Sequence, residues 1–168
     1  NNTQIAILPN ENEDEKIIVK KAFKLKLFKI ITFGNNPSSD IKNVKIQPFD
    51  NFHSKINLKY QNRKLSFMIP NNQILRINNI LICLCIFIFN KINLDFFISV
   101  SMNVPLIEGR GLEQNIIFNK KNIKFIDESY NASPKSMKTI IDFFSDLKTN
   151  KNQKKFLILG DMKELGTK

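Results

Sequence analysis

The sequence has few of the residues that build disulfide frameworks, zinc sites or histidine-based active sites. Its 168 residues include no tryptophan, five glycines, two cysteines and one histidine. Cys83 and Cys85 lie in an apolar stretch with no second pair elsewhere, so the sequence predicts neither a disulfide framework nor a zinc site. We expect both to be buried core thiols in a reducing cytoplasm. His53 lies at a connection beside Phe52, and we expect it to be exposed or locally bonded rather than catalytic.

Long apolar runs are also absent. The longest, residues 80–89, is followed by Asn90 and Lys91, whereas a helix needs about 20 apolar residues to cross a bilayer. The start of the sequence has no secretory signal pattern. We therefore expect a cytoplasmic chain without a transmembrane segment. A hydrophobic content of 42%, with fifteen phenylalanines, argues for a real core and against disorder.

Arginine is scarce although the chain is strongly basic. The net charge is +11, from 26 basic and 15 acidic residues, but only Arg63, Arg76 and Arg110 are arginines. Lysines are spread along the chain instead of gathering in one stripe, and guanidinium is the better reader of base edges. We therefore expect a solvated lysine surface and no specific nucleic-acid partner.

The first hundred residues have the pattern of an α/β fold. An apolar strand at residues 3–8, a helix that begins with acids near Glu13 and ends with lysines, and a strand at residues 27–33 predict a parallel βαβ unit. From residue 41 to 69 the apolar residues alternate, which predicts a small antiparallel meander. Residues 80–89 and 94–100 then predict two helices, the first buried all round.

The rest of the chain predicts a hinge and the start of a second α/β unit. Residues 104–110 leave the helices, and residues 115–118 and 122–126 predict a hairpin that ends at Asp127 and Glu128. A helix follows, with Ser133 as N-cap and Pro134 in its first position. Its free N–H groups would face the acids and could hold an anion. Residues 148–155 read as a solvated basic loop, and residues 156–159 as a buried strand opening on Gly160 and Asp161.

Three motifs occur in one order in this second part. The first is Glu-Gly-Arg at residues 108–110. The second is Asp-Glu-Ser-Tyr-Asn-Ala-Ser-Pro-Lys-Ser-Met at residues 127–137, and the third is Gly-Asp-Met-Lys-Glu-Leu-Gly at residues 160–166. Together they resemble the hinge and the start of the C-terminal domain of the Mur ligases. The Ser-Tyr-Asn-Ala core resembles the members that use D-alanyl-D-alanine.

The resemblance implies a fold and an activity. Residues 1–107 would be the latter part of a central ATP-binding domain, and residues 108–168 the first part of a Rossmann-like C-terminal domain. The implied reaction joins D-alanyl-D-alanine to UDP-N-acetylmuramoyl-tripeptide in peptidoglycan precursor synthesis, through an acyl phosphate and with ATP and Mg²⁺. The family's phosphate loop, Gly-x-x-Gly-Lys-(Thr/Ser), does not occur in the sequence. We expect this loop and the Mg²⁺ ligands in a missing N-terminal part of the ligase, and an isolated chain that is inactive.

The resemblance also implies site residues. Arg110 would meet nucleotide phosphate or ribose, and Glu128 the ribose, with Asp127 on the opposite side of the strand. Asn79 falls on a family asparagine that contacts the nucleotide base. Asn131 and Asp161 are the candidates for substrate binding.

Two other readings stay open. The stretch before Asn79 departs from the family pattern, because Gln73, Leu75 and Arg76 stand where the family has glycine, histidine and asparagine. Another Mur ligase is one alternative, although relatives resemble Asp-Tyr-Ala-His-x-Pro at the second motif. The other is a non-catalytic basic binding module that reuses the fold, which salt-dependent retention on nucleic acid would favour.

Overall fold

The computed structural model describes residues 5–25, 27 and 29–163. These residues form two compact units, Asn1–Pro105 and Leu106–Lys168. The predicted strand residues Thr3 and Gln4, and the last three residues of the third motif, lie outside the described residues.

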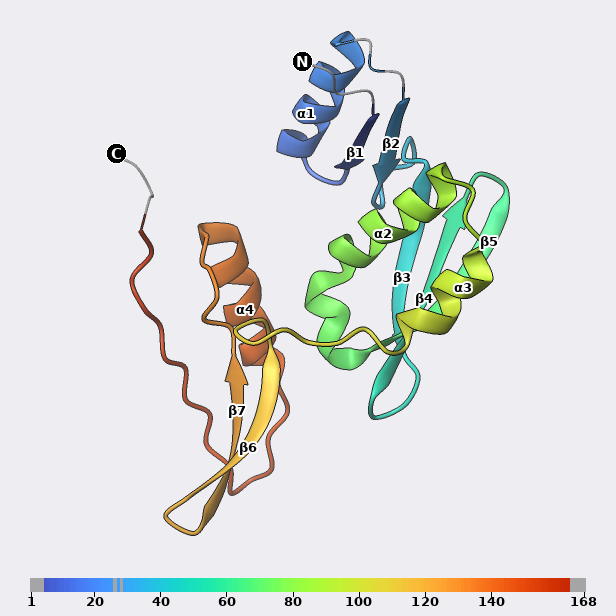
Figure 1. Cartoon of the computed structure of the whole chain (residues 1–168). Helices are drawn as coiled ribbons and strands as arrows, with labels where there is room; N and C mark the ends of the chain where they lie inside the picture. The colour runs from blue at the N-terminus through green and yellow to red at the C-terminus, as the bar shows by residue number, and fades with distance from the viewer. Residues whose placement is uncertain (1–4, 26, 28, 164–168) are drawn as a thin grey trace. The chain divides into compact units, whose positions relative to one another are not determined.

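The first unit contains a five-stranded sheet in the order β1-β2-β3-β4-β5 (Figure 1). Strands β1 (Ile5–Pro9) and β2 (Lys29–Phe33) are parallel and are joined by helix α1 (Glu13–Lys24), which confirms the predicted βαβ unit. The helix begins with a capping box, in which Asn12 Oδ1 accepts from the Glu15 N–H at 2.9 Å. Acids in its first turn and lysines in its last turn match the helix dipole, as predicted.

The antiparallel meander is also confirmed. Strands β3 (Ile41–Pro48), β4 (His53–Tyr60) and β5 (Arg63–Pro70) pair in sequence order, and β3 joins the parallel pair beside β2. The sheet is therefore mixed, and the fold is α/β. His53 lies at the start of β4, where its Nδ1 is 3.1 Å from Asp50 Oδ2, so the histidine is locally bonded.

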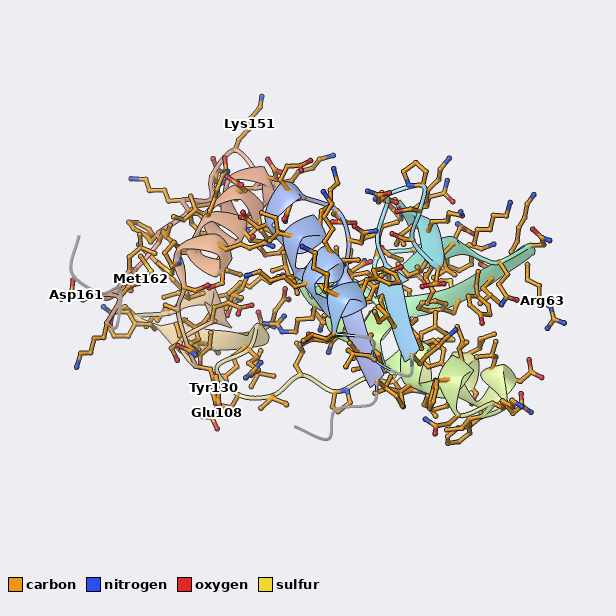
Figure 2. The ribbon with its side chains drawn as sticks, turned by 90° about the horizontal axis from the view of Figure 1, so that it is seen from above. Arg63, Glu108, Tyr130, Lys151, Asp161 and Met162 are labelled. Atoms are coloured by element: carbon orange, nitrogen blue, oxygen red, sulfur yellow. The ribbon has the colours of Figure 1, made fainter. Side chains whose placement is uncertain are left out.

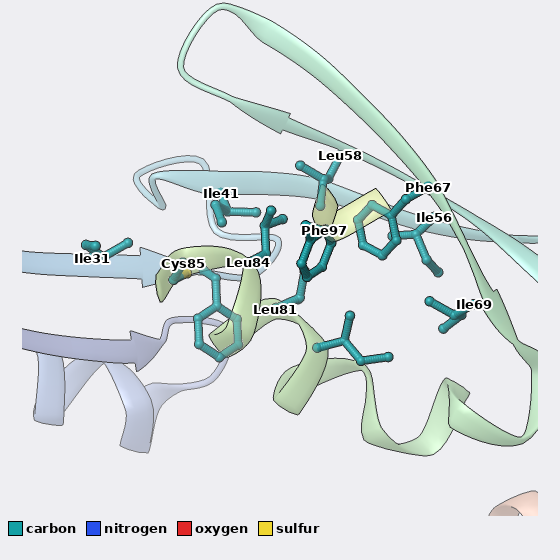
Figure 3. Close-up of a cluster of buried hydrophobic side chains, with 12 residues drawn as sticks. Ile31, Ile41, Ile56, Leu58, Phe67, Ile69, Leu81, Leu84, Cys85 and Phe97 are labelled. Carbon is teal, nitrogen blue, oxygen red and sulfur yellow. The ribbon is translucent and has the colours of Figure 1, made fainter. Parts of the chain in front are cut away.

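Helices cover one face of this sheet and supply its core. A 3₁₀ turn, η1 (Asn71–Arg76), leads into α2 (Ile77–Phe89), and α3 (Leu94–Ser101) follows. Figure 3 shows side chains of α2 and α3 meeting those of the strands. The labelled members of this core are Ile31, Ile41, Ile56, Leu58, Phe67, Ile69, Leu81, Leu84, Cys85 and Phe97.

The prediction that α2 is buried all round is wrong. Its buried residues lie on one side, including Leu84 and Cys85, whereas Cys83 and Ile86 are exposed. The cause is geometric, because a single sheet can cover only one stripe of a helix. The expectation of two core thiols therefore holds for Cys85 and fails for Cys83.

The helical stretch is longer than the apolar run, because η1 continues directly into α2. Over Asn71–Phe89 it has 19 residues and a mean hydropathy of 1.7, so by length and composition alone it could cross a membrane. A core helix of a water-soluble protein meets the same criterion, and the inner side of α2 packs in the core described above.

The second unit begins with a hairpin. Strands β6 (Leu112–Phe118) and β7 (Lys121–Asp127) are antiparallel and meet at Asn119 and Lys120, whose φ angles of 48° and 62° suit a tight hairpin turn. Helix α4 (Pro134–Asp146) then begins at the predicted N-cap, Ser133, whose hydroxyl accepts from the Ser136 N–H at 3.2 Å.

The predicted buried strand at residues 156–159 is wrong. This segment is irregular, and Phe156 and Ile158 are 80% and 89% exposed. A strand needs neighbours for its backbone groups, and the described part of the second unit has only β6 and β7, which pair with each other. Apolar composition thus indicated a tendency to form a strand but could not provide a partner.

The basic loop before this segment is not simply solvated. Lys155 Nζ donates to the carbonyl oxygens of Phe144, Ser145 and Leu147 at 2.9, 2.8 and 3.2 Å. These carbonyls lie at the C-terminal end of α4, where helical partners are missing. One lysine of the loop therefore caps the helix.

Candidate functional site

The hinge motif packs against the strand-tip motif within the second unit. The Tyr130 N–H donates to the Gly109 carbonyl at 3.1 Å, and the Gly111 N–H donates to the Asp127 carbonyl at 2.6 Å. Gly109 and Gly111 have φ angles of 73° and 81°, a region that suits glycine. A Cβ at Gly109 would lie 3.0 Å from the Cβ of Tyr130. We call this pairing of residues 109–111 with residues 127–130 the hinge junction.

Arg110 lies at the centre of the hinge junction. Its backbone N–H donates to the Ile107 carbonyl at 2.9 Å, which fixes the main chain. Its guanidinium carbon is 4.2 Å from the centroid of the Tyr130 ring, a cation–π contact. Tyr130 is 64% exposed, so the contact is at the surface of this unit. Figure 2 labels Tyr130 beside Glu108. Glu108 directly precedes Gly109, whose carbonyl accepts the hydrogen bond from Tyr130.

Asp127 ends β7, and its carboxylate is used inside the loop that follows. Its Oδ1 accepts from the Ser129 N–H at 3.0 Å. Hydrogen bonds from the Ser129 side chain and backbone, and a weaker one from the Gly109 N–H, hold the pKa of Asp127 below its ordinary value. Asp127 therefore orders the hinge junction. Glu128 is half-buried and is the first residue after β7.

The predicted anion-holding groups of α4 are partly used by the chain itself. The Ser133 hydroxyl takes the Ser136 N–H, and the Ser133 N–H donates to Ser136 Oγ at 2.9 Å. Pro134 has no N–H to offer. Asn131 is exposed just before this cap, and its Oδ1 accepts from the Ala132 N–H at 2.8 Å.

Two further candidates are not among the residues that define the hinge junction. Asp161 is exposed in the irregular segment after α4, and Figure 2 shows it well apart from Glu108 and Tyr130. Asn79 belongs to the first unit, where it is exposed in the first turn of α2. The second unit thus brings together three candidates, Arg110, Asp127 and Glu128.

Sequence reasoning passed over Tyr130 as a site residue. It was part of the quoted motif, but no rule linked it to Arg110, twenty positions earlier. The available signal was the pair of glycines around Arg110, which allow another backbone to approach closely. The hairpin between the two motifs then brings Tyr130 to that backbone.

A metal site is not formed by these residues. Among residues 5–25, 27 and 29–163 there is no group of three or more His, Cys, Asp or Glu side chains that could hold a metal ion. We therefore assign Mg²⁺ no ligands among the described residues. Arginine and carboxylate groups at the hinge junction do suit a nucleotide, because they can bind phosphate or ribose oxygens and ribose hydroxyls.

Of the three comparisons with known proteins, only the one with solved structures found matches. No family model matches the sequence, and no curated protein matches it. Solved structures do match, and they show that the chain has the α/β fold of a portion of the Mur ligases. Their sequence identity of 17–18% shows the fold alone.

Three of the matching structures come from Acinetobacter baumannii. Crystal structure I of MurF matches with a TM-score of 0.64 and 17% identity, covering 88% of this chain and 30% of that one. Crystal structure II of MurF matches with a TM-score of 0.60 and 18% identity, covering 86% and 29%. A structure named UDP-N-acetylmuramoylalanyl-D-glutamyl-2,6-diaminopimelate–D-alanyl-D-alanyl ligase has a TM-score of 0.61 and 18% identity, covering 86% and 30%. The chain therefore spans about 30% of the length of these proteins.

Proposed function

We propose that this chain is a nucleotide-holding part of a cytoplasmic, ATP-dependent Mur ligase that joins D-alanyl-D-alanine to UDP-N-acetylmuramoyl-tripeptide. The observation that carries the proposal is the hinge junction. Residues of two separate motifs, Arg110 with Asp127 and Glu128, meet there within a fold shared with MurF over most of the chain. Residues 1–107 would belong to the central ATP-binding domain and residues 108–168 to the C-terminal domain.

The proposed roles follow from side-chain chemistry. Arg110 offers a planar fork of N–H donors to phosphate or ribose oxygens. Glu128 accepts hydrogen bonds from the two ribose hydroxyls, and Asp127 acts indirectly, because its carboxylate already orders the loop. Asn79 would contact the base from the first unit. Asn131 and Asp161 stay as proposals for substrate contact.

The transfer step would depend on groups that this sequence does not carry. It has no phosphate loop motif, so nothing in it positions the γ-phosphate or neutralises its charge. ATP would supply the phosphoryl group that activates the tripeptide carboxylate. We propose that the N-terminal part of the ligase provides the phosphate loop and the Mg²⁺ ligands, and that this chain alone makes no amide bond.

The coding sequence just upstream of Asn1 gives the first test. If that sequence encodes a phosphate loop, in frame or in a neighbouring gene, its product can be made together with this chain and supplied with ATP. The combined protein should release ADP only when both UDP-N-acetylmuramoyl-tripeptide and D-alanyl-D-alanine are present. ADP release with a free amino acid in place of the dipeptide would indicate a different Mur ligase. Salt-dependent retention on nucleic acid without any ADP release would instead contradict the proposal and favour a basic binding module.

A further inference from the structure

We propose that Tyr130 is a positioning residue that holds the Arg110 guanidinium in place for nucleotide binding. This inference rests on the proposed function, because it assigns Tyr130 a role at the same site. The motif matches gave Tyr130 no role, and the inference comes from its contact with Arg110. The guanidinium carbon lies 4.2 Å from the ring centroid, across the hinge junction.

The backbone fixes both partners before their side chains meet. Tyr130 donates its N–H to Gly109, the residue directly before Arg110, and Arg110 donates its own N–H to Ile107. The approach at Gly109 leaves little room for a side chain, since an added Cβ would lie 3.0 Å from the Tyr130 backbone nitrogen. The ring and the arginine side chain thus start from two main-chain segments that are hydrogen-bonded to each other.

The contact restrains Arg110 without using its donors. A cation–π interaction draws on the charge of the guanidinium, so its N–H groups remain able to bind oxygen atoms. Among the described residues, the contact that the structure gives the Arg110 side chain is the one with the Tyr130 ring. A long side chain that is already ordered loses less freedom when a ligand binds, which strengthens binding. Tyr130 would therefore raise nucleotide affinity through Arg110, without touching the nucleotide.

A purely structural Tyr130 is the rival explanation. In that case its removal would loosen the hinge junction and weaken any ligand whether or not Arg110 is present. A double-mutant cycle separates the two roles, because a positioning residue loses its effect once the side chain that it positions is removed.

The experiment is an ADP titration of the full 168-residue chain, followed by NMR. The variants are Tyr130→Leu, Tyr130→Phe, Arg110→Ala and the double variant Tyr130→Leu/Arg110→Ala. Phe118→Leu is the matched control, because Phe118 is a similarly exposed aromatic residue of the same unit. The chemical shifts of the Arg110 δ-protons, displaced by the ring current of an overlying aromatic, report the contact without any nucleotide.

The proposal predicts a set of linked results. Tyr130→Leu weakens ADP binding about two- to fivefold and abolishes the ring-current shift of the Arg110 δ-protons. Tyr130→Phe and Phe118→Leu keep the ADP affinity and the ring-current shift of the parent. In the Arg110→Ala background, Tyr130→Leu has no further effect on affinity. Equal affinities for the parent and Tyr130→Leu, or an equal loss in both backgrounds, would overturn the positioning role and leave the proposed function standing. A parent chain that binds no ADP would overturn the nucleotide role of the hinge junction, and this inference with it.

Discussion

The carbonyl oxygen of Gly109 accepts a hydrogen bond from the Tyr130 N–H at 3.1 Å, and this bond joins the hinge motif to the strand-tip motif. Gly109 is buried at the contact and has a φ angle of 73°. The two motifs are separated along the chain by the β6–β7 hairpin, so the hairpin is what delivers them to each other. The geometry of the candidate site therefore depends on one glycine.

Replacement of Gly109 by alanine should destabilise the second unit. The positive φ alone costs about 1–2 kcal/mol for a residue with a Cβ, and the approach of Tyr130 adds to this cost. Urea unfolding of the parent and of Gly109→Ala measures this loss of stability. Gly160→Ala is the matched control, because nothing lies within 4 Å of a Cβ added there, and its stability should be close to that of the parent. Equal unfolding midpoints for Gly109→Ala and Gly160→Ala would contradict the hinge junction.

Two positions on α2 should respond differently to truncation. Leu84 is fully buried in the core, whereas Ile86, two residues later, is 42% exposed. Leu84→Ala should lower the free energy of unfolding by about 2–5 kcal/mol, because it removes buried methyl groups and leaves a cavity. Ile86→Ala should lower it by less than about 1 kcal/mol. Chemical denaturation gives both values, and a larger loss at Ile86 would show that the buried side of α2 is wrongly assigned.

The two cysteines should differ in reactivity. Burial raises the pKa of the Cys85 thiol to about 12, so at pH 8 it stays neutral and inaccessible, while Cys83 is exposed. Iodoacetamide at pH 8 should therefore label Cys83 and spare Cys85 until the protein is unfolded, as mass spectrometry of the peptides can show. Labelling of both cysteines at one rate in the native protein would contradict the packing of α2.

The raised pKa of Cys85 also predicts a dependence of stability on pH. The folded pKa of Cys85 lies above its ordinary value of 9.0, so the unfolded chain loses this proton first as the pH rises. The contribution of the buried neutral Cys85 thiol to the free energy of unfolding is fully present below pH 9 and declines between pH 9 and about 12. Cys85→Ala should lack this part of the alkaline loss, which unfolding experiments at pH 8 and pH 10 can detect.

Lys155 should stabilise α4 from outside the helix. Its ammonium group donates to three carbonyl oxygens near the end of α4 and lies 5.3 Å from the centroid of the Phe144 ring. Lys155→Met should lower the free energy of unfolding by about 0.3–1 kcal/mol, with a matching loss of helical circular dichroism on heating. Lys151, which projects outward in Figure 2, provides the control, and Lys151→Met should change neither quantity.

Local signals predicted most of the fold. The charge pattern of α1, the N-cap of α4, the alternation of β3–β5 and the hairpin at Asn119 are encoded within a few neighbouring positions, and all are confirmed. The failures concern partners that are distant in sequence. Residues 156–159 have the composition of a strand but no neighbouring strand among the described residues, and Cys83 lies on a side of α2 that the sheet does not cover.

The candidate site was also predictable only where local signals determine it. The motifs named Arg110, Asp127 and Glu128, and the hairpin brings their main chains together. The bond from the Ser129 N–H to the Asp127 carboxylate depends on the loop geometry, so only the structure shows it. The contact between Arg110 and Tyr130 depends on the backbone approach at Gly109, which no local pattern encodes.

The central claim is that this chain holds the nucleotide of an ATP-dependent ligase through the hinge junction. The most direct measurement is the ATP affinity of the chain combined with the phosphate-loop region, compared between the parent and three alanine variants. Glu128→Ala and Arg110→Ala should each weaken ATP binding by about tenfold or more, since each removes hydrogen bonds to or from a charged group, and Asp127→Ala should weaken it less. Equal ATP affinities for the parent and all three variants would contradict the claim.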